Sequence, residues 1–241
     1  MGNNLNTFFY NDLDTNFEQA LEMSEKNFLH SELVEMLQFG NIPQKQIAAM
    51  KLETIKSKKE ADILVSNLTG CDGKIREAVA LKINQLLLKQ PDITSYFTQS
   101  ETFALASIDI NANICRLIID SVQILSKDDK FAVVYLDKIL GFIREAFEEL
   151  DKFIFKDKKY VINKQLFKLY WSLEALKIFA TQLSSDVLFE ILERTSRERE
   201  YTIREKSAQI LSIIKPLKKY DKIRNRLIND ENYYVRIAIN K

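Results

Sequence analysis

Apolar residues recur at spacings of three and four along most of the chain, with charged and polar residues between them. This is the period of an amphipathic α-helix. The pattern predicts helices over residues 12–24, 28–39, 44–52, 60–68, 75–89, 93–107, 114–126, 131–152, 162–180, 188–192, 203–215 and 221–228. The 241 residues include five glycines and three prolines. Because both residues interrupt helices, their scarcity predicts an all-α chain with short connections.

One short pattern repeats inside these helices. It runs from Ile75 to Leu86, returns from Ile203 to Leu211 and begins again at Val235. One position of the pattern, here called the slot, is occupied in turn by Lys45, Arg76, Cys115, Asn163, Arg204 and Arg236, at intervals of 31 to 48 residues. Repeats of this length are typical of helix pairs that stack into a solenoid. We therefore predict a right-handed α-solenoid of about six helix pairs, forming one domain over residues 1–241, with a capping helix in 1–27 and repeats in 28–241.

The repeats resemble a known family. Asp72, Ile75, Arg76, Val79 and Ala80 have the spacing of a HEAT repeat, and weaker matches begin at Glu200 and Asn232. The resemblance covers the chain from about residue 28 onward. It implies a concave face built from helices near 44–56, 75–89, 114–126, 162–180 and 203–215. It also implies that slot residues join neighbouring helix pairs through acidic side chains or carbonyls, at Lys45, Arg76, Arg204 and Arg236.

Charge is distributed unevenly along the chain. Residues 1–120 contain 11 Lys or Arg and 16 Asp or Glu, whereas residues 121–241 contain 24 and 18. The basic residues gather near the C-terminus, and we predict a partner-binding set of Arg194, Arg197, Arg199, Lys215, Lys218, Lys219, Lys222, Arg224 and Arg226. Such a set can bind a phosphate backbone or an acidic protein. The other interpretation is a solvated charged end of the solenoid.

The sequence contains few residues that would carry catalysis. His30 is the single histidine, so metal sites and nucleophilic triads lack their usual ligand or base, and no phosphate-binding or zinc motif occurs. Cys71 and Cys115 are too few for a disulfide framework and suggest reduced thiols in the cytoplasm. No apolar run approaches the roughly 20 residues of a membrane-spanning helix. We predict no enzyme activity, cofactor, metal or membrane association.

A second, more distant resemblance is to the AlkD-type DNA-alkylation-repair glycosylases, which are also HEAT-like domains of similar length. Their activity is associated with a Trp-rich concave cleft that holds a catalytic Asp. This chain has a single tryptophan, Trp171, and no aspartate follows it at helical spacing. The departure argues against glycosylase activity and predicts that Trp171 packs in the core or a groove. Members that bind DNA without catalysis remain within the resemblance.

These observations together predict a cytoplasmic, non-enzymatic scaffold or adaptor that binds another protein along its concave face. The alternative is a DNA-binding module that uses the basic C-terminal residues. An acidic N-terminal half and a basic C-terminal half would orient the partner, or drive head-to-tail self-association. The sequence leaves the identity of the partner and the oligomeric state open.

Overall fold

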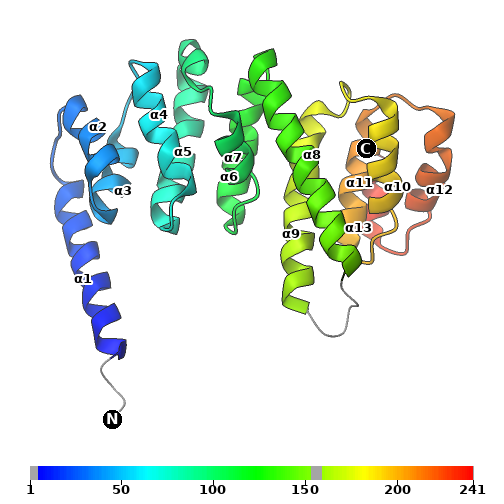
Figure 1. The fold of residues 1–241 in the computed structure, drawn as a ribbon, viewed down its shortest axis with the longest axis horizontal. Helices are drawn as coiled ribbons and strands as arrows, with labels where there is room; N and C mark the ends of the chain where they lie inside the picture. The colour runs from blue at the N-terminus through cyan, green and yellow to red at the C-terminus, as the bar shows by residue number, and fades with distance from the viewer. Residues whose placement is uncertain (1–4, 153–158, 241) are drawn as a thin grey trace. The chain divides into compact units, whose positions relative to one another are not determined.

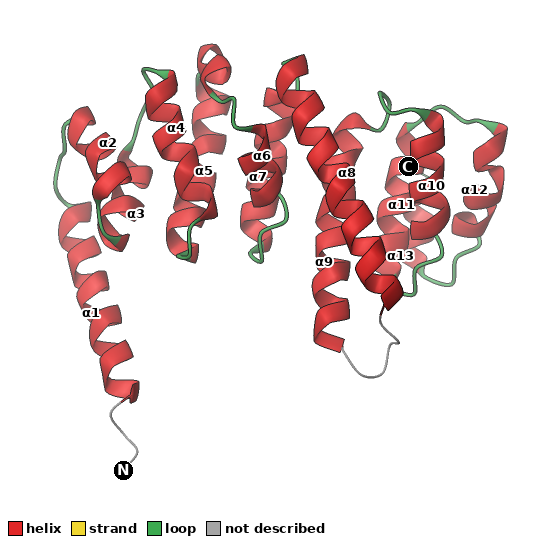
Figure 2. Cartoon of the chain, viewed as in Figure 1, coloured by secondary structure: helices red, strands yellow, loops and turns green. Residues whose placement is uncertain are grey.

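The computed structural model describes the backbone of residues 5–152 and 159–240, and the side chains of residues 15–152 and 159–240. All regular structure in these ranges is helical, and no strand occurs in them (Figure 2). The predicted all-α class is therefore confirmed. The stretch predicted to be irregular, 153–159, lies almost entirely outside the described residues.

The chain divides into two compact units, Met1–Ala132 and Val133–Lys241. The boundary between them falls inside helix α8 (Asp129–Lys152). The prediction of one domain over residues 1–241 stays a prediction.

The first unit is a succession of short helices that pack on one another in chain order (Figure 1). Helix α5 packs between α3 and α7, and α3 also contacts α1 and α2, while α2 packs on α4. The elements are α1 (Leu5–Ser24), α2 (His30–Phe39), α3 (Ile42–Lys51), α4 (Lys58–Ser66), η1 (Asn67–Thr69), α5 (Gly73–Lys89), η2 (Pro91–Tyr96), α6 (Ser100–Ala106), α7 (Ala112–Leu125) and the start of α8.

The second unit repeats this local arrangement. Helix α11 packs between α9 and α13, and α10 and α12 both contact α11. The elements after α8 are α9 (Lys159–Leu176), η3 (Lys177–Phe179), α10 (Ser185–Thr195), α11 (Tyr201–Ile213), η4 (Lys218–Tyr220), α12 (Asp221–Ile228) and α13 (Tyr233–Ile239).

Short polar side chains start the central helices. The side chain of Asp72 accepts hydrogen bonds from the backbone N–H groups of Lys74 and Ile75, and Asn111 and Asn232 accept from the backbone N–H two residues on. These caps satisfy N–H groups that lack a partner within the helix. Each cap lies four residues before a slot position, so the caps fix where each slot residue stands on its helix.

One predicted helix is wrong. Residues 93–107 form the 3-10 helix η2 and helix α6, separated at Phe97–Gln99. Phe97 and Phe103 are both buried, and their rings meet edge to face with centroids 6.3 Å apart. In a continuous helix, residues six apart point about 120° away from each other and lie about 9 Å apart along the axis. The break at Phe97–Gln99 therefore allows the rings of both Phe97 and Phe103 to lie in the core.

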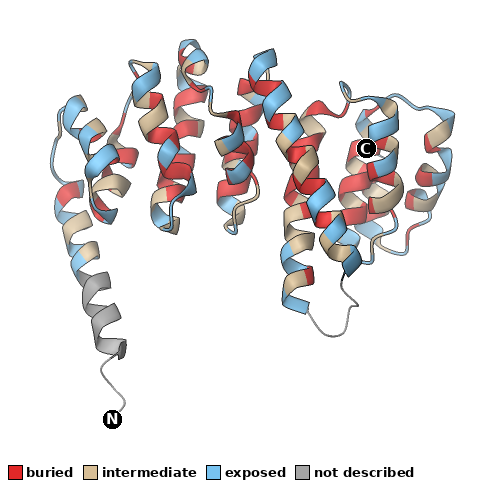
Figure 3. Ribbon diagram, in the orientation of Figure 1, coloured by how far each residue is buried: buried red, intermediate tan, exposed pale blue. Residues whose placement is uncertain are grey.

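Small residues allow the central helices to pack closely. Ala48 and Ala49 of α3 and Val79 and Ala80 of α5, which occupy equivalent places in the repeated pattern, are all completely buried. Figure 3 shows the buried positions of α5 beside exposed ones on the same helix, as the amphipathic pattern predicts. Trp171 is buried on α9 and packs edge to face with Phe167 and Tyr170, which confirms its predicted place in the core.

Candidate interaction surfaces

The slot residue Arg76 links two helix pairs of the first unit. Its Nε lies 2.7 Å from Oδ2 of Asp109 and its Nη2 lies 3.3 Å from Oδ1, while Nη1 donates to the carbonyl of Gly70 at 2.7 Å. Both side chains of the pair are 10% exposed. The hydrogen bond to Asp109 raises the pKa of Arg76. A two-pronged contact of this kind suits the planar guanidinium and fixes both position and orientation.

Arg204 makes the same set of contacts in the second unit. Its Nε and Nη2 lie 2.7 and 3.0 Å from the two carboxylate oxygens of Asp230, and Nη1 donates to the carbonyl of Glu198 at 2.8 Å. In both units the carbonyl acceptor stands six residues before the arginine. We call this arrangement the Arg–Asp clamp; its two examples are Arg76 with Asp109 and Arg204 with Asp230.

Each clamp aspartate also organises the next slot. The Asp109 carboxylate accepts from the backbone N–H of Asn111, and its carbonyl accepts from the Cys115 thiol at 3.0 Å. In the same way Asp230 accepts from the N–H of Asn232, and its carbonyl accepts from Arg236 at 2.5 Å. Cys115 and Arg236 are therefore equivalent positions. The signal for this in the sequence, which the slot pattern does not include, is an Asp-x-Asn sequence that begins six residues before the slot.

The slot residues Lys45 and Asn163 do not form an Arg–Asp clamp. Lys45 donates from Nζ to Oδ1 of Asn67 at 3.0 Å, so it reaches the next helix pair but meets a neutral amide. Asn67 in turn donates to the carbonyls of Leu37 and Ile63. Asn163 is exposed, whereas the side chains of Arg76, Cys115 and Arg204 are buried.

Several of the predicted partner-binding residues already have acidic partners inside the second unit. Arg194 contacts both carboxylate oxygens of Asp151, at 2.7 and 3.0 Å, and stacks over the Phe147 ring. Lys219 lies 2.7 Å from Asp186. Arg197 and Arg226 share the carboxylate of Glu193. Burial would raise the pKa of Glu193, but hydrogen bonds from the two arginines hold it below its usual value.

The remaining members of the set fall into two groups. Arg224 donates to the Leu211 carbonyl, and the Arg199 carbonyl accepts from Arg204, so both lie against helix α11. Lys215, Lys218 and Lys222 are exposed, and their side chains make no hydrogen bond or ion pair with the rest of the described chain. These three lysines, here called the lysine corner, are the part of the predicted set that is open to an external anion.

Lys206, which contributes to the basic composition of this region, is buried instead. Its Nζ bonds to Glu174 and lies 4.5 Å from the centre of the Tyr170 ring. Burial would lower the pKa of Lys206, but the contact with Glu174 raises it on balance. Lys206 and Glu174 therefore join α11 to α9 and leave no charge for a partner.

Among the described residues, no three His, Cys, Asp or Glu side chains are grouped so that they could hold a metal ion. His30 Nε2 is 3.0 Å from Glu60 Oε2 between α2 and α4. Cys71 is exposed, while burial raises the pKa of the Cys115 thiol to about 12, so this sulfur is a neutral packing group. Within the two described ranges, no helix combines the length and apolarity that crossing a membrane requires.

No protein-family model and no curated protein matches the chain. Among solved structures it is similar to an engineered protein from the Northeast Structural Genomics Consortium, at 12% identity and a TM-score of 0.46. That match covers 88% of this chain and 95% of the engineered one.

Proposed function

We propose that each unit is a short HEAT-like solenoid and that the protein is a non-enzymatic scaffold. A protein partner would lie along the helices that pack in series, α3, α5 and α7 in one unit and α9, α11 and α13 in the other. Right-handed stacking of about six pairs and a concave binding face, both expected from the sequence, belong to this proposal.

The observation that carries the proposal is the repetition of the Arg–Asp clamp. Arg76 and Arg204 lie 128 residues apart, yet each spans two helix pairs through the same atoms and at nearly the same distances. A repeated contact that fixes one helix pair on the next is what a solenoid needs, because each pair cannot bury its apolar face alone. The two buried arginines, Arg76 and Arg204, thus hold one helix pair on the next, which supports a structural rather than a chemical role for them.

Exposed apolar side chains on the stacked helices supply candidate contacts. Leu81 and Leu88 of α5 are 42% and 66% exposed, and their spacing of seven places them on one face. Met50 on the adjacent α3 is 56% exposed and borders a hollow of about 590 Å³ that Lys82 also lines. Apolar side chains among polar neighbours are typical of sites that bind a protein segment.

The proposal is tested by site-specific photocrosslinking in the cells from which the protein comes. A benzophenone amino acid replaces Met50, Leu81 or Leu88 in turn, and matched controls carry it at Phe17 or Leu105, which are exposed on α1 and α6. We expect one partner to crosslink from the three stacked-helix positions and not from the controls. Equal yields from both sets, or none from the first, would remove the proposal.

The alternative is DNA binding through the lysine corner, which is favoured because Lys215, Lys218 and Lys222 have no partner among the residues whose side chains the structure describes. Three phosphate contacts would give log K a slope of roughly −2.7 against log salt, since each contact contributes about −0.9. Replacing all three lysines by glutamine should abolish binding without disturbing an ion pair. Replacing Lys219 and Arg226 is a poorer test, because it would remove the partner of Asp186 and leave Glu193 paired with Arg197 alone.

This alternative is decided by fluorescence anisotropy with a short duplex at low and physiological salt. Salt-sensitive binding that disappears in the triple glutamine variant would favour DNA. Unchanged binding by that variant, or none by the wild-type protein at low salt, would reject the lysine corner as a DNA site.

A further inference from the structure

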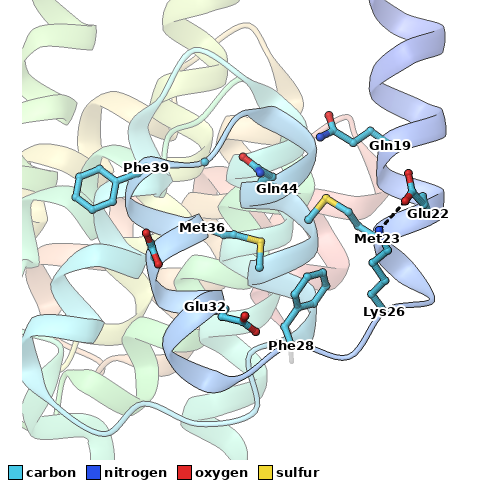
Figure 4. A pocket seen from close by; sticks show the side chains of 11 residues that line it. Gln19, Glu22, Met23, Lys26, Phe28, Glu32, Met36, Phe39 and Gln44 are labelled. Atoms are coloured by element: carbon cyan, nitrogen blue, oxygen red, sulfur yellow. Dashed lines mark hydrogen bonds and ion pairs between the residues drawn. The ribbon is translucent and has the colours of Figure 1, made fainter.

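A groove lies at the start of the first unit, between α1 and the α2–α3 pair. It has a volume of about 500 Å³. Figure 4 shows Met23 of α1 and Met36 of α2 directed into the space between the helices, with Phe28 from the connecting segment beside them. Met23 is buried, whereas Met36 and Phe28 remain partly exposed. The groove therefore has an apolar floor that is open to solvent.

The floor is fixed by backbone and hydrogen bonds. A Cβ on Gly40 would lie 2.5 Å from the Met36 carbonyl oxygen, so only glycine permits this close approach of the α2–α3 turn. The side chains of Gln19 and Asn41 join α1 to the turn at 3.2 Å. Methionine side chains on such a rigid floor can adapt to differently shaped apolar groups, because the thioether is flexible and polarizable.

The rim of the groove has a net negative charge, with three glutamates and one lysine among its lining residues. Glu22 forms an ion pair with Lys26 at 2.6 Å, so these two opposite charges offset each other. Glu32 and Glu35 also line the groove, are exposed and have no basic partner among the residues whose side chains are described. Residues 1–50 as a whole contain seven Asp or Glu and two Lys. An apolar floor with two uncompensated carboxylates on its rim is complementary to an apolar stripe flanked by cations.

We propose that this groove binds an amphipathic helix with a basic polar face, contributed by a protein partner. The apolar side chains of that helix, at spacings of three and four, would contact Met23, Phe28 and Met36. Its lysines or arginines would face Glu32 and Glu35. The inference rests on the proposed scaffold function in taking a protein partner. Its groove shares Lys26 and Phe28 with the hollow at Met50, but Leu81 and Leu88 of α5 line neither space.

The test uses the purified full chain and a fluorescein-labelled synthetic peptide of about 18 residues with leucine at i, i+3, i+4 and i+7 and lysine elsewhere. A second peptide carries glutamate in place of every lysine. Anisotropy titrations should give a micromolar Kd for the lysine peptide, with at least tenfold weaker binding of the glutamate peptide. Equal binding of both peptides would overturn the proposal.

Matched variants locate the binding. Met36→Gln keeps the length of the side chain but makes the floor polar, and we expect it to weaken the lysine peptide about fivefold or more. Met50→Gln makes the same change on α3 outside the groove and should leave the Kd unchanged. Glu32→Gln, which retains an acceptor for the Leu29 N–H, should weaken binding and reduce its salt dependence, whereas Glu25→Gln outside the groove should not.

Three results would refute the groove as the site: Met36→Gln and Met50→Gln having equal effects, Glu32→Gln and Glu25→Gln having equal effects, or no binding of the lysine peptide. Sedimentation velocity without peptide gives a fourth. If the wild-type protein self-associates and Met36→Gln abolishes this, the occupant is a second copy and the proposal fails. The scaffold proposal is judged separately, because crosslinking from Leu81 and Leu88, which do not line this groove, does not depend on it.

Discussion

Replacing Arg204 by methionine tests whether the Arg–Asp clamp holds the second unit together. The Arg204 side chain is 10% exposed and that of Asp230 is 6% exposed, so the substitution leaves a carboxylate buried without its main partner. Removing one member of a buried ion pair costs about 3–5 kcal/mol. Asp230 retains the backbone N–H of Asn232 at 2.8 Å, so we expect the lower end, about 3 kcal/mol.

The loss should depend on pH. Burial would raise the pKa of Asp230, but the hydrogen bonds from Arg204 and Asn232 lower it on balance. A lowered pKa in the folded state contributes stability above the pKa of the unfolded aspartate, about 3.9, and this contribution disappears as pH falls through the folded value. In Arg204→Met the burial effect dominates and Asp230 can protonate. The difference between wild type and variant should therefore shrink as pH falls from about 7 towards 4.

The assay is urea unfolding followed by tryptophan fluorescence. Trp171 is the single tryptophan of the chain and lies on α9, which packs on the helix that carries Arg204. Arg236→Met is the matched control, because the hydrogen bonds of Arg236 within the described part of the chain go to the backbone carbonyls of Asp230 and Glu231. It should cost about 1 kcal/mol, with a smaller pH dependence than Arg204→Met, because the charge of Arg236 contributes less than Arg204 to lowering the pKa of Asp230.

Two results would refute this reasoning. One is a cost below about 1 kcal/mol for Arg204→Met, which would mean that the pair contributes no more than an exposed ion pair. The other is a cost that stays the same at low pH. Adding Asp230→Asn to Arg204→Met should recover part of the stability, since it removes the unpaired charge, and further destabilisation by this change would also count against the clamp.

Arg76→Met removes the clamp of the first unit and should lower stability by about 3 kcal/mol in urea unfolding followed by circular dichroism. If residues 1–241 form the single domain predicted from the sequence, Arg76→Met should also lower the urea midpoint measured by Trp171 fluorescence. Separate unfolding transitions for the two signals would contradict that domain assignment. A thiol reagent at about pH 8 should modify exposed Cys71 and leave Cys115 intact, because burial raises the pKa of Cys115 to about 12; equal reaction rates would refute the burial argument. Gly40→Ala should cost about 1–3 kcal/mol through its clash with the Met36 carbonyl, and an unchanged urea midpoint would show that the turn can relax.

Helical periodicity predicted most of the fold because it reports which face of each helix is buried, and burial depends on nearby residues. The predicted 131–152 corresponds to α8, Asp129–Lys152. The break at Phe97–Gln99 contains neither glycine nor proline, so no local signal marks it. Its cause is the packing of Phe97 on Phe103, a tertiary contact that overrides the local preference.

The candidate surface was harder to predict because charge counts ignore distant partners. Arg194 and Asp151 are 43 residues apart, and Lys219 and Asp186 are 33 apart. Their pairing follows from how α8, α10 and η4 lie in the second unit, which no spacing rule in the sequence describes. The basic region therefore contributes fewer open charges than its composition indicates, and the lysine corner emerges only from the structure.

The geometry of the Arg–Asp clamp also explains why the junction between the helix pairs of Lys45 and Arg76 has no such clamp. Asp109 and Asp230 stand six residues before Cys115 and Arg236, but the residue six before Arg76 is Gly70. The preceding slot residue, Lys45, accordingly has no carboxylate to meet and bonds to Asn67. A Cβ on Gly70 would meet nothing within 4 Å, and φ there is −81°, which any residue adopts. Position 70 therefore has room for an aspartate equivalent to Asp109 and Asp230.

Gly70→Asp should therefore stabilise the first unit. Restricting the unfolded chain contributes about 0.4–1 kcal/mol for any replacement that fits, and Gly70→Asn measures this part alone. Pairing with Lys45 should add about 0.5 kcal/mol for the aspartate, since Gly70 is exposed and such pairs are weak. Urea unfolding followed by circular dichroism compares the two variants in wild-type and Lys45→Met backgrounds. The advantage of aspartate over asparagine should vanish without Lys45, and an advantage that persists would show that the two positions do not form a clamp.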